Sequence, residues 1–225
     1  ALVRVVVAAD AILAAVLVKR LDAAWAVGTN AGGLDTGSIA NNTYHVHLIK
    51  RSDTGVVDAL FSLSATAPTM PTSYDFRRRI GSIVRTAGAI GAFLQDGDTF
   101  VWTGGPISDV STVNPGTAAV TATLSVPTGI RVKASVHASY VYVVVGETTV
   151  YFYVSDLSTT DVAAGAANTI LGGFNRSGSN WGSGGWIEVF TNTSAQVRYR
   201  SSFSDANVTF TLGTRGWTDR RGRDD

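Results

Sequence analysis

The stretch YHVHLIKRSDTGVVDALFSL, residues 44–63, decides the fold class. Residues 44–50 combine β-branched, aromatic and other apolar side chains and predict a strand, and residues 56–63 predict a second one. Between them, Asp53-Thr54-Gly55 predicts a hairpin turn, because a three-residue loop that ends in Gly suits a left-handed backbone position. The stretch therefore predicts two antiparallel strands joined directly to each other.

The composition of the whole chain favours strands joined by turns. Of the 225 residues, 46 are Ser or Thr and 24 are Gly; Asp outnumbers Glu by 15 to 2, and Arg outnumbers Lys by 15 to 3. Glu and Lys are the residues that fill exposed helix faces, whereas Asp is typical of turns and caps. The chain is therefore predicted to be all-β, an antiparallel β-sandwich or jelly-roll-like fold with little helix.

Charge and cysteine content argue against several kinds of partner and site. Lys and Arg (18) nearly balance Asp and Glu (17), and the net charge of +1 gives no strong field toward nucleic acid or an anionic membrane. The chain contains no Cys, which excludes a disulfide framework, a thiolate zinc site and a cysteine nucleophile. We expect no nucleic-acid partner and no membrane insertion.

The apolar opening of the chain, residues 1–18, does not read as a membrane span. Arg4 and Asp10 interrupt it, so no uncharged run approaches the about 20 residues that a bilayer requires. Asp10 also breaks the apolar run that a signal peptide needs. We expect buried strands at 2–8 and 12–21; an Ala-rich helix over 11–21 is the competing interpretation.

Residues 103–117 form the best candidate for a linker, because they contain three Gly and two Pro. A chain of this length can bury one large β core or two small ones. We therefore expect a single sandwich-like module over 1–225, with 103–117 as a possible split into 1–102 and 118–225.

The candidate metal and acid residues have simpler structural explanations. His45 and His47, two apart in a predicted strand, point to one face, where Asp58 could complete a metal site. No third ligand has a diagnostic spacing, so half-buried polar positions in a sheet are the favoured interpretation. Asp53 with Asp58, and Asp96-Gly97-Asp98, are better explained by turns than by paired carboxylates or calcium. Nucleophile-elbow, zinc-protease and P-loop motifs are absent from the sequence, so we expect no catalytic residue, metal or other cofactor.

The segment LGGFNRSGSNWGSGGW, residues 171–186, is the strongest binding candidate. Sugars present apolar C–H faces to aromatic rings, while Asn, Asp or Arg side chains satisfy the hydroxyls. A Gly-rich loop is also where binding residues tend to lie. The candidate glycan-binding residues are Phe174, Asn175, Arg176, Asn180 and Trp181. In the alternative interpretation, the Trp181 side chain packs the loop against the rest of the protein, and Trp186 begins a core strand.

Two arginine runs stand out in this weakly charged chain. Arg77-Arg78-Arg79 is the denser, and the second, at 220–223, is bordered by Asp residues on both sides. Arginine runs can grip phosphate or sulfate groups. Because the acidic neighbours largely compensate the tail run, we favour Asp–Arg pairing within or between subunits over a polyanion site.

Ten short motifs from about Lys19 to the C-terminus resemble, in order, the C-terminal region of tail-fibre-like structural proteins of tailed bacteriophages and prophages. They are KRLDAAWAVGT (19–29), GGLDTGSI (32–39), YHV (44–46), DTGVVD (53–58), SATAPTMP (64–71), RRIGS (78–82), QDGD (95–98), LSVPTG (124–129), LG (212–213) and GWTDRRGR (216–223). One departure is Thr214-Arg215, an insertion in this chain. The resemblance implies a β-rich, trimeric virion protein and supplies no catalytic or receptor-contact residues.

Three functions follow as hypotheses. The first is a non-enzymatic fibre or fibre-tip domain on the surface of the extracellular particle, a homotrimer that contacts other virion proteins and contributes to attachment to a host-surface glycan. The second is a purely structural capsid decoration, collar or connector protein. The third is a glycan depolymerase, for which Glu147 and Glu188 would be the first acids to mutate.

Overall fold

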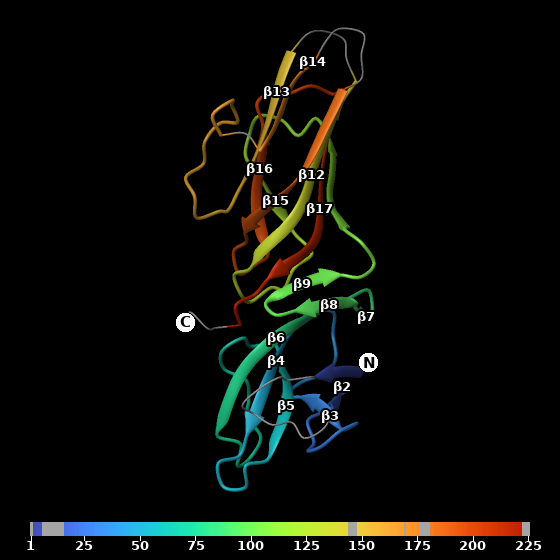
Figure 1. Ribbon diagram of the computed structural model, residues 1–225, viewed down its shortest axis with the longest axis vertical. Coiled ribbons are helices and arrows are strands. Elements are labelled where there is room, and N and C mark those ends of the chain that lie inside the picture. Colours follow the sequence, from blue (N-terminus) through green and yellow to red (C-terminus); the bar gives the residue numbers. More distant parts are fainter. Residues whose placement is uncertain (1, 6–15, 144–147, 169, 176–180, 222–225) are drawn as a thin grey trace. The chain divides into compact units, whose positions relative to one another are not determined.

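The computed structural model describes residues 2–5, 16–143, 148–168, 170–175 and 181–221, and every regular element in these ranges is a β-strand (Figure 1). Most strand pairs are antiparallel, which confirms the predicted all-β, sandwich-like fold class. The competing helix over 11–21 is wrong in its described part, because a strand begins at Leu17. No helix of the described residues is long and apolar enough to cross a membrane.

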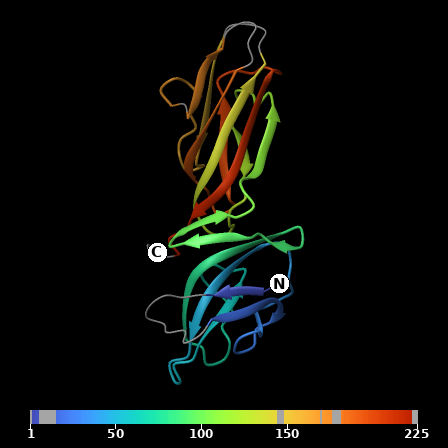
Figure 2. The ribbon, with the colours of Figure 1, turned by 45° about the vertical axis from the view of Figure 1, so that its right-hand side comes forward.

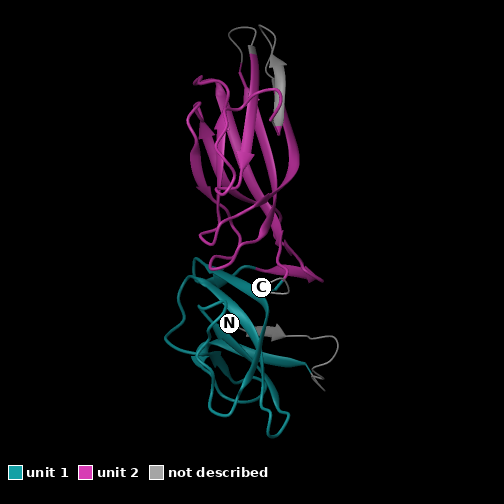
Figure 3. Cartoon of the chain, turned by 90° about the vertical axis from the view of Figure 1, so that its left-hand side faces the viewer, with its two compact units in different colours: residues 1–91, 221–225 teal, residues 92–220 magenta. Residues whose placement is uncertain are grey.

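The chain divides into two compact units (Figure 3). Unit 1 contains residues 1–91 and 221–225, and unit 2 contains residues 92–220. The segment 103–117, the possible linker, lies within unit 2. There, β10 (Ile107–Val113) pairs antiparallel with β17 (Val208–Thr218), so this segment contributes a strand to a sheet.

Unit 1 is built on a seven-stranded sheet with the order β1-β2-β3-β5-β4-β6-β7. The strands are β1 (Leu2–Val5), β2 (Leu17–Ala24), β3 (Gly32–Leu34), β4 (Thr43–Lys50), β5 (Val57–Ser62), β6 (Phe76–Thr86) and β7 (Ala89–Ile90). The predicted hairpin at 44–63 is confirmed: β4 and β5 are antiparallel, with His47 opposite Leu60. Gly55 in its turn has a φ of 72°, a left-handed conformation that Gly adopts without steric cost.

Apolar side chains of unit 1 pack around the β4–β5 hairpin. Ile49, Leu60 and Tyr74 form a buried cluster, and Trp25 packs against it with its ring centroid 5.1 Å from that of Tyr74. The Trp25 indole N–H donates a hydrogen bond to the Ala59 carbonyl at 3.1 Å, which satisfies its polar atom.

A buried ion pair lies beside this cluster. Lys19 and Asp58 are 0% and 1% exposed, and Lys19 Nζ lies 3.1 Å from Asp58 Oδ1. Lys19 also donates to the Ala26 carbonyl at 2.6 Å, and Asp58 accepts the Gly28 N–H at 2.8 Å. Burial lowers the pKa of Lys19, and the hydrogen bond and charge of Asp58 oppose that shift. The pair therefore fastens residues 26–28 to β2 and β5.

Unit 2 contains two sheets (Figure 2). The first has the order β15-β12-β17-β9-β8, with β10 also paired to β17; the second has the order β11-β16-β13-β14. The remaining strands are β8 (Phe93–Asp96), β9 (Thr99–Trp102), β11 (Val120–Thr123), β12 (Lys133–Tyr142), β13 (Thr148–Ser155), β14 (Leu171–Asn175), β15 (Trp181–Phe190) and β16 (Gln196–Ser201).

Aromatic side chains form the core between these two sheets. Phe210 of β17 stacks on Phe152 of β13, with ring centroids 4.8 Å apart and planes within 4° of parallel. Tyr140 of β12 and Tyr199 of β16 add rings 4.8 Å from Phe152 and 5.1 Å from Phe210, respectively. The sheets therefore pack face to face, as in a β-sandwich.

Two predicted segments differ in detail from the structure. The sequence around Thr86-Ala87-Gly88 predicts a hairpin of 79–85 with 90–95, but only a short β6–β7 pair forms there, and Phe93–Asp96 forms β8 and pairs with β9 across the predicted Asp96-Gly97-Asp98 turn. The second is the expected loop at 171–186, which lies largely in β14 and β15. Within β15, Gly182 and Gly184 lie against β12: a Cβ on Gly182 would lie 2.7 Å from the Tyr140 carbonyl oxygen.

Candidate functional site

The outward face of the larger unit 2 sheet carries the candidate binding site. Side chains alternate along β12, so that Ala134, Val136 and Ala138 are buried while His137 and its outward neighbours are partly exposed. The same alternation along β15 exposes Trp186, whereas Val189 is buried. We define the Trp186 face as the outward-facing residues Gly184, Trp186, Glu188 and Phe190 of β15, Lys133, Ser135, His137 and Ser139 of β12, and Thr211, Gly213 and Arg215 of β17, together with Arg131.

Strand register brings these residues into rows across the sheet. His137 pairs with Trp186 on one side and with Gly213 on the other. Ser139 pairs in the same way with Gly184 and Thr211, and the Ser139 and Thr211 hydroxyls are hydrogen-bonded at 2.6 Å. A row of small hydroxyl and glycine residues therefore lies next to the row that contains the indole.

Trp186 is the main aromatic surface of this face. Its side chain is 52% exposed, and the His137 ring meets it edge to face with centroids 5.0 Å apart. The Arg215 guanidinium lies 5.5 Å from the centre of the indole, within the range of a cation–π interaction. An indole flanked by an imidazole and a guanidinium presents both an apolar plane and hydrogen-bond donors to a ligand.

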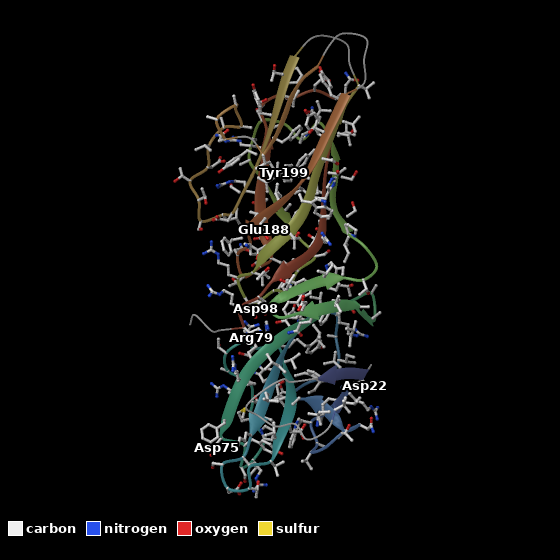
Figure 4. All side chains as sticks on the ribbon, in the orientation of Figure 1. Asp22, Asp75, Arg79, Asp98, Glu188 and Tyr199 are labelled. Carbon is white, nitrogen blue, oxygen red and sulfur yellow. The ribbon has the colours of Figure 1, made fainter. Side chains whose placement is uncertain are left out.

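A second aromatic–arginine pair lies further along β15. Phe190 is 46% exposed, and the Arg131 guanidinium lies 4.6 Å from its ring centre. Between the two pairs, Lys133 Nζ and Glu188 Oε2 form an ion pair at 2.6 Å; Glu188 is labelled in Figure 4. The face thus offers apolar rings, cationic groups and hydroxyls together, the combination that sugar recognition uses.

A β-bulge places Arg215 on this face. Val136 of β12 pairs with Thr214 and Ser135 pairs with Gly216, so that Arg215 is the extra residue in β17. Bulges re-aim side chains, and here the arginine is exposed while Thr214 and Gly216 are buried. The Thr214-Arg215 segment of β17 therefore supplies a cation of the candidate site.

Three of the predicted glycan-binding residues lie at strand ends of the same sandwich. Phe174 and Asn175 close β14, opposite Thr149 and Thr148, and Trp181 opens β15 opposite Tyr142. Arg176 and Asn180 lie outside the described residues. The assignment of this segment to glycan binding stays a prediction.

For Trp186, the alternative interpretation of the sequence is wrong. The alternative interpretation made it the first residue of a core strand, whereas it lies within β15 and is half exposed. The signal that indicates its exposure is the alternation through 186–190, where Ile187 and Val189 are the less exposed apolar positions and Glu188 is exposed.

The histidines and acids of unit 1 do not come together as a metal site. His45 Nδ1 is hydrogen-bonded to Ser82 Oγ at 2.9 Å, and His47 Nε2 to the Ser64 carbonyl at 3.0 Å. Asp58 pairs with Lys19, and Asp53 pairs with Arg51. Among the residues that the structure describes, no group of three or more His, Cys, Asp or Glu side chains is arranged to hold a metal ion.

Asp–Arg ion pairs occur away from the two arginine runs. The Arg51 side chain holds the pKa of Asp53 down at about 2. Asp161 lies 3.4 Å from Arg198 Nε and 3.1 Å from Arg200 Nη1, which fastens the loop after β13 to β16. In the 77–79 run, Arg77 instead donates to the Thr66 carbonyl at 3.0 Å.

Comparisons with known proteins give few matches. No protein-family model matches the sequence, and no curated protein matches it. Among solved structures, the chain is similar to one described as "Structure of infectious bursal disease virus Gt strain", with 16% sequence identity and a TM-score of 0.22. The match covers 84% of this chain and 53% of that one, so this chain spans about half its length. A TM-score this low carries no argument about function.

Proposed function

We propose that this chain is a non-enzymatic structural protein of a bacteriophage particle, a fibre or fibre-tip module that attaches to a host-surface glycan through the Trp186 face. The observation that carries the proposal is the half-exposed Trp186, flanked on a regular sheet by His137 at 5.0 Å and Arg215 at 5.5 Å. The phage assignment itself is supported by the ordered tail-fibre-like motifs between about Lys19 and the C-terminus.

The exposure of the Trp186 indole on this sheet supports a binding role. Several outward positions of the neighbouring strands hold Ser, Thr or Gly, which suit a solvated sheet face. Exposed apolar surface that is bordered by polar residues is typical of a binding site. Sugar rings match this surface because their C–H faces cover the indole while Arg215, His137 and the nearby hydroxyls meet polar atoms.

Trimeric assembly would strengthen such a site. A sheet face without a deep enclosure gives weak binding to a single glycan. Three linked copies raise the overall avidity without any new contact, provided that their sites reach the same surface. We therefore place the module at the particle surface as a homotrimer attached to other virion proteins.

A second candidate function is a purely structural connector. Val113 and Val141 are 60% and 49% exposed, and both pair with Thr209, so they lie in one row across the outward face of the sheet. A row of exposed valines is typical of a contact with another protein. The two functions differ in their requirement for Trp186: glycan attachment needs its ring exposed in the assembled particle, whereas a connector would cover it.

The depolymerase hypothesis gains less support. Of its two candidate acids, Glu188 is ion-paired with Lys133 at 2.6 Å, and Glu147 lies outside the described residues. A glycosidase of the usual kind needs two carboxyl groups that face each other across the scissile bond.

A glycan array probed with the multivalent full chain tests the proposal. We expect binding to at least one class of bacterial surface glycan, reduced at least about tenfold by Trp186→Ala. Phe76→Ala is the matched control, because Phe76 is 58% exposed but belongs to unit 1. Trp181→Ala tests the 174–181 segment in parallel. Absence of binding at high valency, or equal loss in Trp186→Ala and Phe76→Ala, would refute attachment through this face.

A further inference from the structure

We infer that the Trp186 face recognises an acidic glycan, a chain of linked sugars bearing carboxylates, which lies along β15 on two aromatic–arginine subsites. The inference rests on the proposed function and names its ligand class. The subsites are Trp186 with Arg215 and Phe190 with Arg131.

The two subsites repeat the same chemistry at a fixed spacing. Trp186 and Phe190 are four residues apart on the same face of β15, which corresponds to about 13 Å along a strand. Each ring is about half exposed and each has a guanidinium within 6 Å of its centre. The separation exceeds the width of a single sugar ring, so one ligand that occupies both subsites must be an oligosaccharide.

The positive charge of the Trp186 face favours an acidic ligand over a neutral one. Arg131 and Arg215 are exposed, and within the described part of the chain no carboxylate forms an ion pair with either of them. The one acid of the face, Glu188, is matched by Lys133. The face therefore carries an excess of two positive charges in a chain whose net charge is only +1. A neutral glycan would leave both guanidinium groups without a charged partner.

Guanidinium chemistry suits a sugar carboxylate. The planar guanidinium can donate two parallel hydrogen bonds to a carboxylate, and it can lie against an aromatic ring at the same time. An acidic sugar whose C–H face covers Trp186 would place its carboxylate beside Arg215, and a second would repeat this arrangement at Phe190 and Arg131. The bulge in β17 re-aims the Arg215 side chain, whose guanidinium lies beside Trp186.

The test compares an oligogalacturonate hexasaccharide and a polysialic acid hexasaccharide with their carboxyl-reduced, neutral forms, in calorimetric titrations of the full chain. We expect one or both acidic probes to bind, with at least about tenfold weaker binding after carboxyl reduction and in Arg215→Gln or Arg131→Gln. Arg78→Gln is the control, because Arg78 is an exposed arginine of unit 1 whose loss lowers the total charge equally.

The outcomes separate the two claims. Equal affinity for the acidic and neutral forms, or an equal effect of Arg78→Gln and Arg215→Gln, overturns the acidic-glycan inference but leaves glycan attachment standing. Binding to neutral glycans alone on the array would likewise overturn the acidic-glycan inference and leave glycan attachment standing. No binding to any glycan, either on the array or in the titrations, overturns both claims.

Discussion

Thr214 of β17 donates a hydrogen bond from its hydroxyl to the carboxylate of Asp109 in β10. The other Asp109 oxygen accepts the Ser125 N–H at 2.9 Å and the Ser125 hydroxyl at 2.6 Å. Burial raises the pKa of Asp109, and these hydrogen bonds oppose the rise. Because Thr214 immediately precedes Arg215, the half-buried Asp109 carboxylate supports the bulge that exposes this arginine.

Replacement of Thr214 by Val tests this support. Val keeps the branched shape of the fully buried side chain but removes the donor to a charged acceptor, so we expect a loss of about 1.5–3 kcal/mol in the stability of unit 2. Chemical denaturation followed by Trp fluorescence measures it. Thr209→Val, on the same strand but facing outward, is the control. Equal destabilisation by the two variants would show that the Asp109 contact contributes nothing specific.

We expect the stability of unit 1 to depend on pH through His47. Its Nε2–H donates to the Ser64 carbonyl, while the buried Nδ1 has no hydrogen-bond partner among the described residues. Burial lowers the pKa of His47, and the charges of Arg79 and Arg77 lower it further, against the hydrogen bond to Ser64. The folded state therefore favours the neutral ring. The contribution of neutral His47 to the stability of unit 1 is fully present above a pH of about 6.5, the pKa of an unperturbed His. This contribution decreases as the pH falls below that value.

Hydrogen exchange of β4 and β5 amides between pH 8 and pH 5, corrected for intrinsic rates, measures this effect. We expect protection to decrease below a pH of about 6.5 in the wild-type chain and to decrease less in His47→Gln, whose amide nitrogen can still donate to Ser64. His137→Gln, in unit 2, is the control. An identical pH profile in the wild-type chain and His47→Gln would exclude His47 as the titrating group.

The buried Lys19–Asp58 pair predicts a large effect of a single substitution. Lys19→Met removes the cation and leaves Asp58 buried without its charged partner, so we expect a loss of about 3–5 kcal/mol in the stability of unit 1. The double variant Lys19→Met/Asp58→Asn should recover part of this loss, because no lone charge remains. A double-mutant cycle from denaturant titrations measures the coupling. Additive effects of the two substitutions would contradict a direct interaction.

The parts of the fold that were predictable depend on short-range signals. The β4–β5 hairpin follows from apolar strand residues on either side of a turn in which Gly55 takes a left-handed conformation. The prediction of a loop at 171–186 is wrong for most of the segment, because glycine normally indicates a loop. Here Gly184 is accommodated in a strand opposite Ser139, where a Cβ would lie 3.1 Å from both the Ser139 and the His137 side chains. Only the pairing with β12, distant in sequence, reveals this requirement.

The sequence predicts a sugar-binding segment, but it does not predict which residues form the Trp186 face. An aromatic, Gly-rich segment with polar neighbours indicates sugar binding, and Trp186 lies within it. Its partners His137 and Arg215 come from strands that the register of the sheet brings alongside. Arg215 is exposed only because of a bulge in β17, which depends on pairing between distant segments. No local pattern indicates that three such segments share one face.

Glycan attachment through the Trp186 face is tested most directly by NMR titrations of the ¹⁵N-labelled full chain with the oligogalacturonate and the polysialic acid hexasaccharides, following the Trp186 indole N–H. With at least one of the two probes, we expect a saturable shift of this resonance together with the Arg215 and Arg131 side-chain N–H signals, and no such shift in Trp102, whose indole donates to the Ser125 carbonyl inside unit 2. A Trp186 resonance that stays unchanged with both probes, while a glycan binds elsewhere or while no glycan binds at all, would contradict attachment through this face.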